Sequence, residues 1–118
     1  MEKYLFIAQC DCTDPAKEKE VIAWLDDIHI PDALATPGFV KAERWVNINP
    51  EENKRPKFMA IYEIETDDIK KFDAAFHQSM KKMEQNNRLC SFSVPERAYP
   101  FATTYYKKAK TFKKSTGK

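Results

Sequence analysis

The chain has 118 residues, of which 42% are hydrophobic and 32% are charged, a composition typical of one folded domain. No apolar run approaches the roughly 20 residues that a membrane-spanning helix needs, so we expect no contact with a membrane. The charged Glu2 and Lys3 lead directly into an apolar stretch instead of a signal peptide, which favours a cytoplasmic protein. The three cysteines have no CxxC spacing and no histidine-rich surroundings, so we expect neither a disulfide framework nor a metal site.

Charge is distributed unevenly along the chain. Residues 107–118 contain six lysines and no acidic residue, and because the whole chain carries +2, residues 1–106 carry −4. We therefore expect a folded domain over 1–106 and a basic C-terminal tail over 107–118, whose simplest interpretation is a disordered, solvated end. Such a tail can also contact nucleic acid, anionic lipid or an acidic partner. Residues 1–106 show no nucleic-acid-binding pattern, so we expect no nucleic-acid partner.

The first predicted elements are a strand and a helix. Lys3–Cys12 is rich in β-forming residues and apolar on both faces, which predicts a strand covered on both sides. Thr13 or Asp14 is a candidate N-cap before a proline at the first helical position, and apolar residues at helical spacing continue to about Ile28. Pro31 disfavours the helical conformation in the residue before it, so we expect the helix to end there.

Two strands and a second helix follow. Phe39–Asn47 and Lys57–Glu65 are predicted strands separated by a polar loop. Thr66 is a candidate N-cap for a long helix that ends near residue 86 and carries five apolar residues at helical spacing. His77 falls outside that apolar stripe, so we interpret it as a solvent-exposed residue.

A fourth strand is predicted over Arg97–Lys107, where Pro100 requires an edge position or a bulge. The resulting β-α-β-β-α-β order predicts an α+β, ferredoxin-like fold, with one four-stranded antiparallel sheet and two helices on one face. Because the strands carry apolar residues on both faces, the other face of the sheet needs a cover. We therefore expect a symmetric homodimer with sheet packed on sheet.

The segment Trp24–Val40 carries a family resemblance. Its sequence, WLDDIHIPDALATPGFV, resembles the W-x-x-x-x-H-x-P-D-x-L-x-x-P-G-F segment of the EthD-like branch of the dimeric α/β barrel superfamily. The resemblance implies a dimeric α/β barrel over nearly all of the domain, to about residue 106. Relatives with this fold include polyketide cyclases, muconolactone isomerases, aldoxime dehydratases and both heme-degrading and quinone-forming monooxygenases. The fold alone therefore does not determine the reaction.

His29 is the leading candidate for chemistry. An imidazole gives or takes a proton near neutral pH, and His29 lies at the border of the apolar face of the first predicted helix. The resemblance implies that this histidine borders a pocket between helices and sheet. The alternative, which the sequence leaves open, is that His29 hydrogen-bonds the last carbonyls of the helix and holds the turn at Pro31.

Other side chains complete the candidate site. Tyr62 or Arg44 would polarise a substrate carbonyl, and Trp24, Phe39 and Trp45 would line an apolar, ligand-binding cavity. The alternative is that these aromatic residues are ordinary core. Arg44 and Glu43 fall on opposite faces of their strand, and we expect one to face solvent and the other to join the dimer interface.

These observations favour a cofactor-independent cyclase or isomerase that acts on a small aromatic or polyketide-like molecule by acid/base chemistry. The chain has no glycine-rich phosphate loop, no metal-ligand spacing and no nucleophile elbow. Two alternatives remain open at this point, a noncatalytic small-molecule-binding or stress-related protein and a cofactor-free monooxygenase. A third is an interaction protein whose basic tail docks on an acidic partner.

Overall fold

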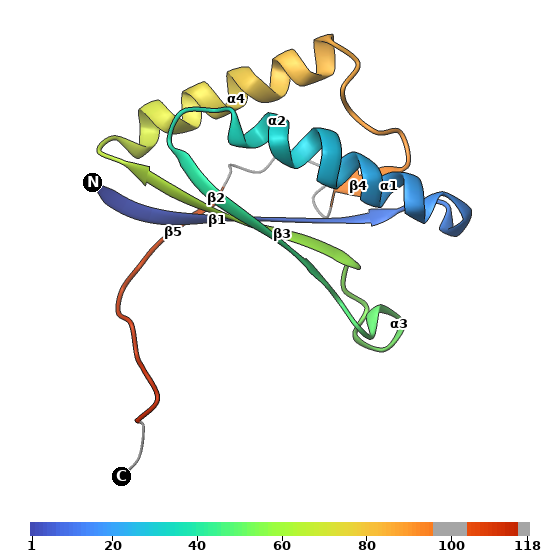
Figure 1. The fold of residues 1–118 in the computed structure, drawn as a ribbon, viewed down its shortest axis with the longest axis horizontal. Coiled ribbons are helices and arrows are strands. Elements are labelled where there is room, and N and C mark those ends of the chain that lie inside the picture. Colours follow the sequence, from blue (N-terminus) through green and yellow to red (C-terminus); the bar gives the residue numbers. More distant parts are fainter. Residues whose placement is uncertain (96–103, 116–118) are drawn as a thin grey trace.

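The computed structural model describes residues 1–95 and 104–115, and its main feature is one antiparallel sheet (Figure 1). The strands run in the order β2-β3-β1-β4, and β5 also pairs with β1. Their bounds are β1 Glu2–Cys12, β2 Phe39–Val46, β3 Phe58–Thr66, β4 Ser93–Pro95 and β5 Tyr105–Lys107. The helical segments of 15–34 and the long helix α4 (Ile69–Gln85) lie on the same face of the sheet. The predicted α+β, ferredoxin-like fold is confirmed.

The edge of the sheet beside β1 is formed by two short strands. β4 pairs with the end of β1, with Cys10 opposite Pro95, and β5 pairs with its beginning, with Phe6 opposite Tyr105. The sequence predicted a single strand over Arg97–Lys107. Of that range, 97–103 lies outside the described residues, and Tyr105–Lys107 is a strand as predicted. β4 was not predicted, because three residues are too few to show an alternating pattern.

The first helix does not end before Pro31, and the prediction that it would is wrong. A 3₁₀ turn, η1 (Pro15–Lys17), and helix α1 (Glu18–Trp24) lead into a π-helical turn, η2 (Leu25–His29), and then into α2 (Ile30–Leu34). Asp14 caps the start, since its side chain accepts a hydrogen bond from the backbone N–H of Ala16 at 2.9 Å.

The π turn explains how the chain passes a proline. In η2 the backbone N–H of Ile30 donates to the carbonyl of Leu25, five residues back. Pro31 is the second residue of α2 and has no backbone N–H to donate to the carbonyls of the preceding π turn, and the wider turn accommodates its ring. His29 therefore lies inside a continuous helical segment and not at a helix end.

The N-cap of α4 lies two residues later than predicted. Asp68, not Thr66, is its N-cap, and its carboxylate accepts from the backbone N–H of Lys71 at 3.1 Å. The hydroxyl of Thr66 instead accepts from the backbone N–H of Asp68 at 3.2 Å. The helix buries Phe72, Phe76 and Met83 as the periodicity predicted, so the cap error does not change which face meets the sheet.

The core between helices and sheet is divided into two clusters. The larger cluster is built around a set of aromatic rings, namely Phe6, Phe39, Tyr62, Phe72 and Phe76. The smaller cluster contains Val21, Leu25 and Phe58. Strands β1 and β3 cross both clusters, whereas α4 packs on the larger and α1 on the smaller. This division leaves space between the clusters.

The face of the sheet turned away from the helices is apolar at its centre. Cross-strand pairs on this outer face are Leu5 with Tyr106, Ile7 with Ile61, and Trp45 with Met59. Trp45 is 53% exposed, and Leu5, Ile7 and Tyr106 are also exposed. Within the described residues, no helix combines the length and the apolar character that crossing a bilayer requires.

Candidate functional site

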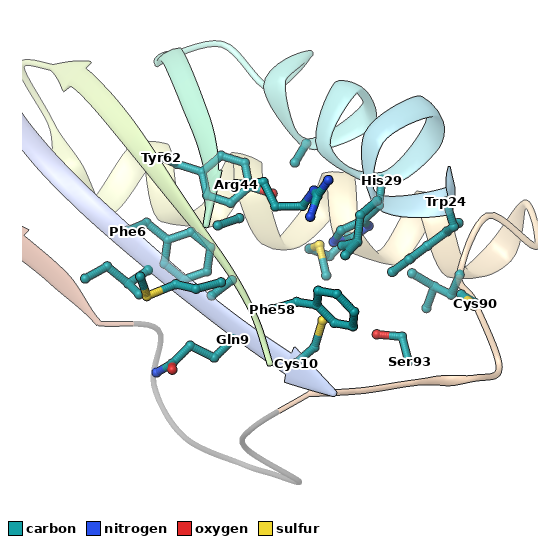
Figure 2. Close-up of a pocket in the computed structure, with 18 of the residues that line it drawn as sticks. Phe6, Gln9, Cys10, Trp24, His29, Arg44, Phe58, Tyr62, Cys90 and Ser93 are labelled. Carbon is teal, nitrogen blue, oxygen red and sulfur yellow. The ribbon is translucent and has the colours of Figure 1, made fainter. Parts of the chain in front are cut away.

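A cavity of about 510 Å³ lies between the helical layer and the sheet, at the junction of the two core clusters (Figure 2). The inner face of β1 and β3 forms its floor, with Phe6, Cys10, Phe58 and Tyr62. Helices α1, α2 and α4 and the turn η2 form its roof, and the segment 89–93 closes one end. Its lining is mostly apolar, as in pockets that bind small organic molecules.

His29 lies in the roof of this cavity. Its imidazole stacks on the indole of Trp24, with ring centroids 4.4 Å apart and an interplanar angle of 20°. Burial lowers the pKa of His29 from its usual 6.5, and the nearby Asp32 opposes this shift only in part. The Nδ1 atom is buried, and no described residue hydrogen-bonds it. His29 therefore does not cap a helix through Nδ1, and its ring is held neutral beside an apolar space.

The Trp24 ring is held in place by a hydrogen bond to the chain after α4. Its indole N–H donates to the backbone carbonyl of Arg88 at 2.7 Å. The guanidinium of Arg88 in turn forms a two-point ion pair with Asp32, at 2.7 and 2.9 Å. That pairing lowers the pKa of the Asp32 carboxyl. The indole thus presents one fixed face to the His29 imidazole.

Arg44 enters the site from β2. It lies on the inner face of the sheet, and its guanidinium donates to both carboxylate oxygens of Asp26 at 2.6 and 3.0 Å. Figure 2 shows the side chain reaching past Tyr62 toward His29. Glu43 lies on the outer face, where Lys41 is 3.9 Å away. We expected one of Glu43 and Arg44 to face solvent and the other to join a dimer interface. Arg44 instead points toward the helices, where Asp26 binds its guanidinium.

Tyr62 and two thiols complete the floor and one end. Tyr62 is 2% exposed, and burial raises its pKa, so the phenol stays protonated and able to donate. Cys10 and Cys90 line the cavity together with Ser93, and both thiols are free. Burial also raises the pKa of Cys10, which keeps it a thiol and a poor nucleophile.

A second histidine lies at the rim. His77 is solvent-exposed, as the sequence predicted, and it also lines the cavity. Its Nδ1 donates to the backbone carbonyl of Asp73 at 2.8 Å, and the Asp73 carboxylate lies 3.3 Å away. The same carboxylate accepts from the hydroxyl of Tyr105 at 2.5 Å, which links β5 to α4. These contacts place the proton of a neutral His77 on Nδ1.

Four of the six side chains proposed from sequence meet at the cavity, namely Trp24, His29, Arg44 and Tyr62. Phe39 and Trp45 are not among the lining residues. Phe39 is buried in the larger core cluster, where it packs on Tyr62 and Phe72. Trp45 lies on the outer face of the sheet, because it is one residue out of phase with the inward-facing Arg44.

Sequence reasoning missed several lining residues. Cys10 shares the inward phase of β1 with Phe6, so strand alternation could have found it. His77 was missed because it lies beside the apolar stripe of α4. Helical periodicity does not tell whether a residue at that position borders a cavity or faces only solvent. Cys90 and Ser93 have no periodic signal. Among the described residues, no three His, Cys, Asp or Glu side chains are grouped so as to hold a metal ion.

Fold and cavity together define a ferredoxin-like α+β domain with a small-molecule-sized pocket between its helices and its sheet. Residues 4–93 match the family described as "Domain of unknown function (DUF4286)", and the chain belongs to that family. A search of curated proteins found no match. A solved structure from Shewanella loihica PV-4, described as a "putative monooxygenase", is similar with a TM-score of 0.56 and 18% sequence identity, covering 93% of this chain and 97% of that one. At this identity the likeness supports the fold alone.

Proposed function

We propose that the cavity binds a small aromatic or polyketide-like molecule and that His29 moves a proton on it, without a cofactor. The observation that carries the proposal is the His29 imidazole, which is kept neutral by burial, stacked on Trp24 and left without a described partner at Nδ1, at the wall of an apolar cavity. A neutral imidazole in such a place accepts a proton, and a reaction of the cyclase or isomerase type begins with that step.

The other polar groups would then act on the oxygen of the substrate. A carbon next to a carbonyl loses its proton more easily when the carbonyl oxygen receives a hydrogen bond, because negative charge develops there. Tyr62 remains a neutral phenol and Arg44 a cation, and both line the cavity with His29. The ion pair with Asp26 would orient the Arg44 guanidinium and reduce its net charge.

Proton abstraction can be tested before a substrate is known. We would incubate acetophenone-type and 1,3-diketone compounds with the protein in D₂O and follow exchange of the α-proton by NMR. Wild type is expected to accelerate exchange for part of the panel, and His29→Gln to lower that rate by roughly 100-fold to 10,000-fold. Lys81→Gln, on the exposed side of α4, is the control and should retain the rate. Binding without exchange in wild type would contradict catalysis and favour the noncatalytic alternative.

A cofactor-free monooxygenase is the second candidate, favoured by the description of the Shewanella loihica protein. It shares the first step, since a carbanion made by His29 would be the species that reacts with O₂. Oxygen uptake with a compound that shows His29-dependent exchange separates the two reactions. A cyclase or isomerase consumes no oxygen, whereas a monooxygenase consumes it in proportion to product.

We also propose that two copies pack through the outer face of the sheet to form the dimeric α/β barrel implied by the EthD-like segment Trp24–Val40. The support is the set of exposed apolar side chains on that face, namely Leu5, Ile7, Trp45 and Tyr106. Monomers rarely leave such a surface uncovered. A monomer mass by light scattering at micromolar concentration, without concentration dependence, would refute the dimer. The cytoplasmic location stays a prediction.

A further inference from the structure

Arg88 is fixed in place by the way helix α4 ends. Asn87 has a positive φ of 57°, which turns the chain back after the helix. The backbone N–H of Asn87 donates to the carbonyl of Glu84 at 3.2 Å. The backbone N–H of Arg88 donates to the carbonyl of Met83 at 2.9 Å. Together these two bonds form a Schellman motif, which ends a helix in one defined direction and so positions Arg88.

From this position Arg88 contacts both helical segments on either side of His29. Its backbone carbonyl accepts from the indole N–H of Trp24, the last residue of α1, at 2.7 Å. Its guanidinium donates to both carboxylate oxygens of Asp32 in α2, at 2.7 and 2.9 Å. His29 lies between these two residues in the chain and stacks on Trp24. Arg88 thus contacts the surroundings of His29, although it is not among the residues that line the cavity.

The Asp32 carboxylate is the group that this contact keeps from His29. Residues three positions apart in a helical segment lie on the same face, so the two side chains are neighbours. The negative charge of Asp32 acts to raise the pKa of His29, although burial has the larger, opposite effect. The Nδ1 atom of His29 is buried and has no hydrogen-bonding partner among the described residues. Arg88, and not His29, therefore receives the oxygens of this carboxylate.

Other titratable or charged groups line the cavity together with His29. They come from the strands, from α4 and from the chain after it, namely Cys10, Arg44, Tyr62, His77 and Cys90. Burial raises the pKa of Cys10 and of Tyr62, so both stay neutral, and Arg44 is paired with Asp26. Within the described part of the chain, Asp32 is the group whose charge shifts the pKa of His29. A change in the pairing of Asp32 should therefore appear in the titration of His29.

We propose that Arg88 is a positioning residue for His29 and that its guanidinium holds the Asp32 carboxylate so that no histidine–carboxylate pair forms. This inference rests on the proposed function and deepens it, because a base without a carboxylate partner stays neutral and accepts a proton from the substrate. Without the guanidinium, Asp32 would turn to His29 and stabilise the imidazolium. His29 would then hold a proton before any substrate arrives.

NMR titration of the full chain tests the role of Arg88. The imidazole resonance that is absent from His29→Gln identifies His29. Arg88→Gln is expected to raise its titration midpoint, and Arg88→Lys to raise it by less, since lysine keeps the charge but not the two-point geometry. Asp32→Asn should lower the midpoint. Arg55→Gln, which removes the same charge from an exposed site between β2 and β3, is the matched control and should not move it.

The double variant shows through which residue Arg88 acts. In the Asp32→Asn background, Arg88→Gln is expected to produce little further shift, because the carboxylate that it would release is gone. The same upward shift in both backgrounds would overturn the proposal, since Arg88 would then act on His29 through its own charge alone. An unchanged midpoint in Arg88→Gln would also overturn it. If that variant does not fold, an unchanged midpoint in Arg88→Lys decides in the same way.

The proposed function fails on a different measurement. The pH profile of α-proton exchange should follow the midpoint of His29 and move to higher pH in Arg88→Gln. A raised midpoint with an unmoved profile would overturn the positioning role of Arg88. Exchange that is absent from wild type would contradict His29 as a base, while the titrations would still decide whether Arg88 keeps Asp32 from His29.

Discussion

The His29 imidazole is neutral because burial excludes water from it, and not because a partner hydrogen-bonds its Nδ1. The charged imidazole loses more hydration than the neutral one when His29 is buried, so its pKa falls below 6.5. The negative charge of Asp32 raises the pKa of His29 only in part, and the Asp32 carboxylate is paired with the guanidinium of Arg88 through two hydrogen bonds. The residue is thus available as a base at neutral pH, and its titration couples to folding.

We expect the free energy of unfolding to decrease as the pH falls below about 6.5. The unfolded chain protonates this imidazole near 6.5, whereas the folded protein does so only at lower pH. Between these values the unfolded state binds more protons and is favoured. His29→Gln should flatten this part of the curve, and urea titrations between pH 5 and 8 on both proteins measure it. Identical curves would mean that His29 is not buried in solution. Asp32 does not contribute in this range, because Arg88 lowers its pKa and its stabilising charge is lost only at more acidic pH.

Residue identity alone predicted part of the site. His29 was named for its proton chemistry and for the family resemblance, Tyr62 and Arg44 as groups that could polarise a carbonyl, and Trp24 as an aromatic residue that could line a cavity. The sequence left open which of Arg44 and Glu43 faces inward. Trp45 was misplaced, although it is adjacent to Arg44, because aromatic character says nothing about which face of a two-sided apolar sheet a side chain joins. Such a sheet gives no polar alternation to set the phase.

At the level of elements, the sequence predicted three strands and the long helix to within a few residues. It did not predict the passage through Pro31, since local rules describe the α-helix and not the π turn that absorbs one extra residue. The sequence also did not predict that two short strands, β4 and β5, pair with β1. Both features depend on tertiary contacts: the helical segment must continue to place Ala33 in the core, and β5 is tied to α4 through Tyr105.

Gly38, which joins α2 to β2, provides an element-scale prediction. Its φ of 111° is rare for other residues, and a Cβ there would lie 2.5 Å from Cδ1 of Phe72. Gly38→Ala is therefore expected to destabilise the protein by about 1–3 kcal/mol, measured by urea denaturation. Gly38→Ala with Phe72→Leu should cost less than the sum of the two single changes, because the smaller side chain relieves the clash. An unchanged urea midpoint in the single variant would contradict the strained turn.

For the whole molecule, the sequence predicted the fold from the order of its elements, and the two-sided apolar strands led to the proposed dimer. Trp45→Glu places a charge on the outer face at the edge strand β2, opposite Met59 of β3. If that face is the interface, the dimer dissociation constant should rise by at least about tenfold, since the carboxylate would be buried without a partner. Ala23→Glu, exposed on α1, is the control. Equal sedimentation of all three proteins would place the interface elsewhere.

The division of the core into two clusters has a consequence for motion. The smaller cluster, with Val21, Leu25 and Phe58, is the principal anchor of α1, whereas α4 is held by the larger aromatic cluster. Helix α1 can therefore open locally at a lower free energy than global unfolding, and its opening would expose the cavity. Backbone amides of Glu18–Trp24 should exchange hydrogen for deuterium faster than those of Ile69–Gln85. A molecule bound beside His29 would join the two clusters and slow exchange in α1 most.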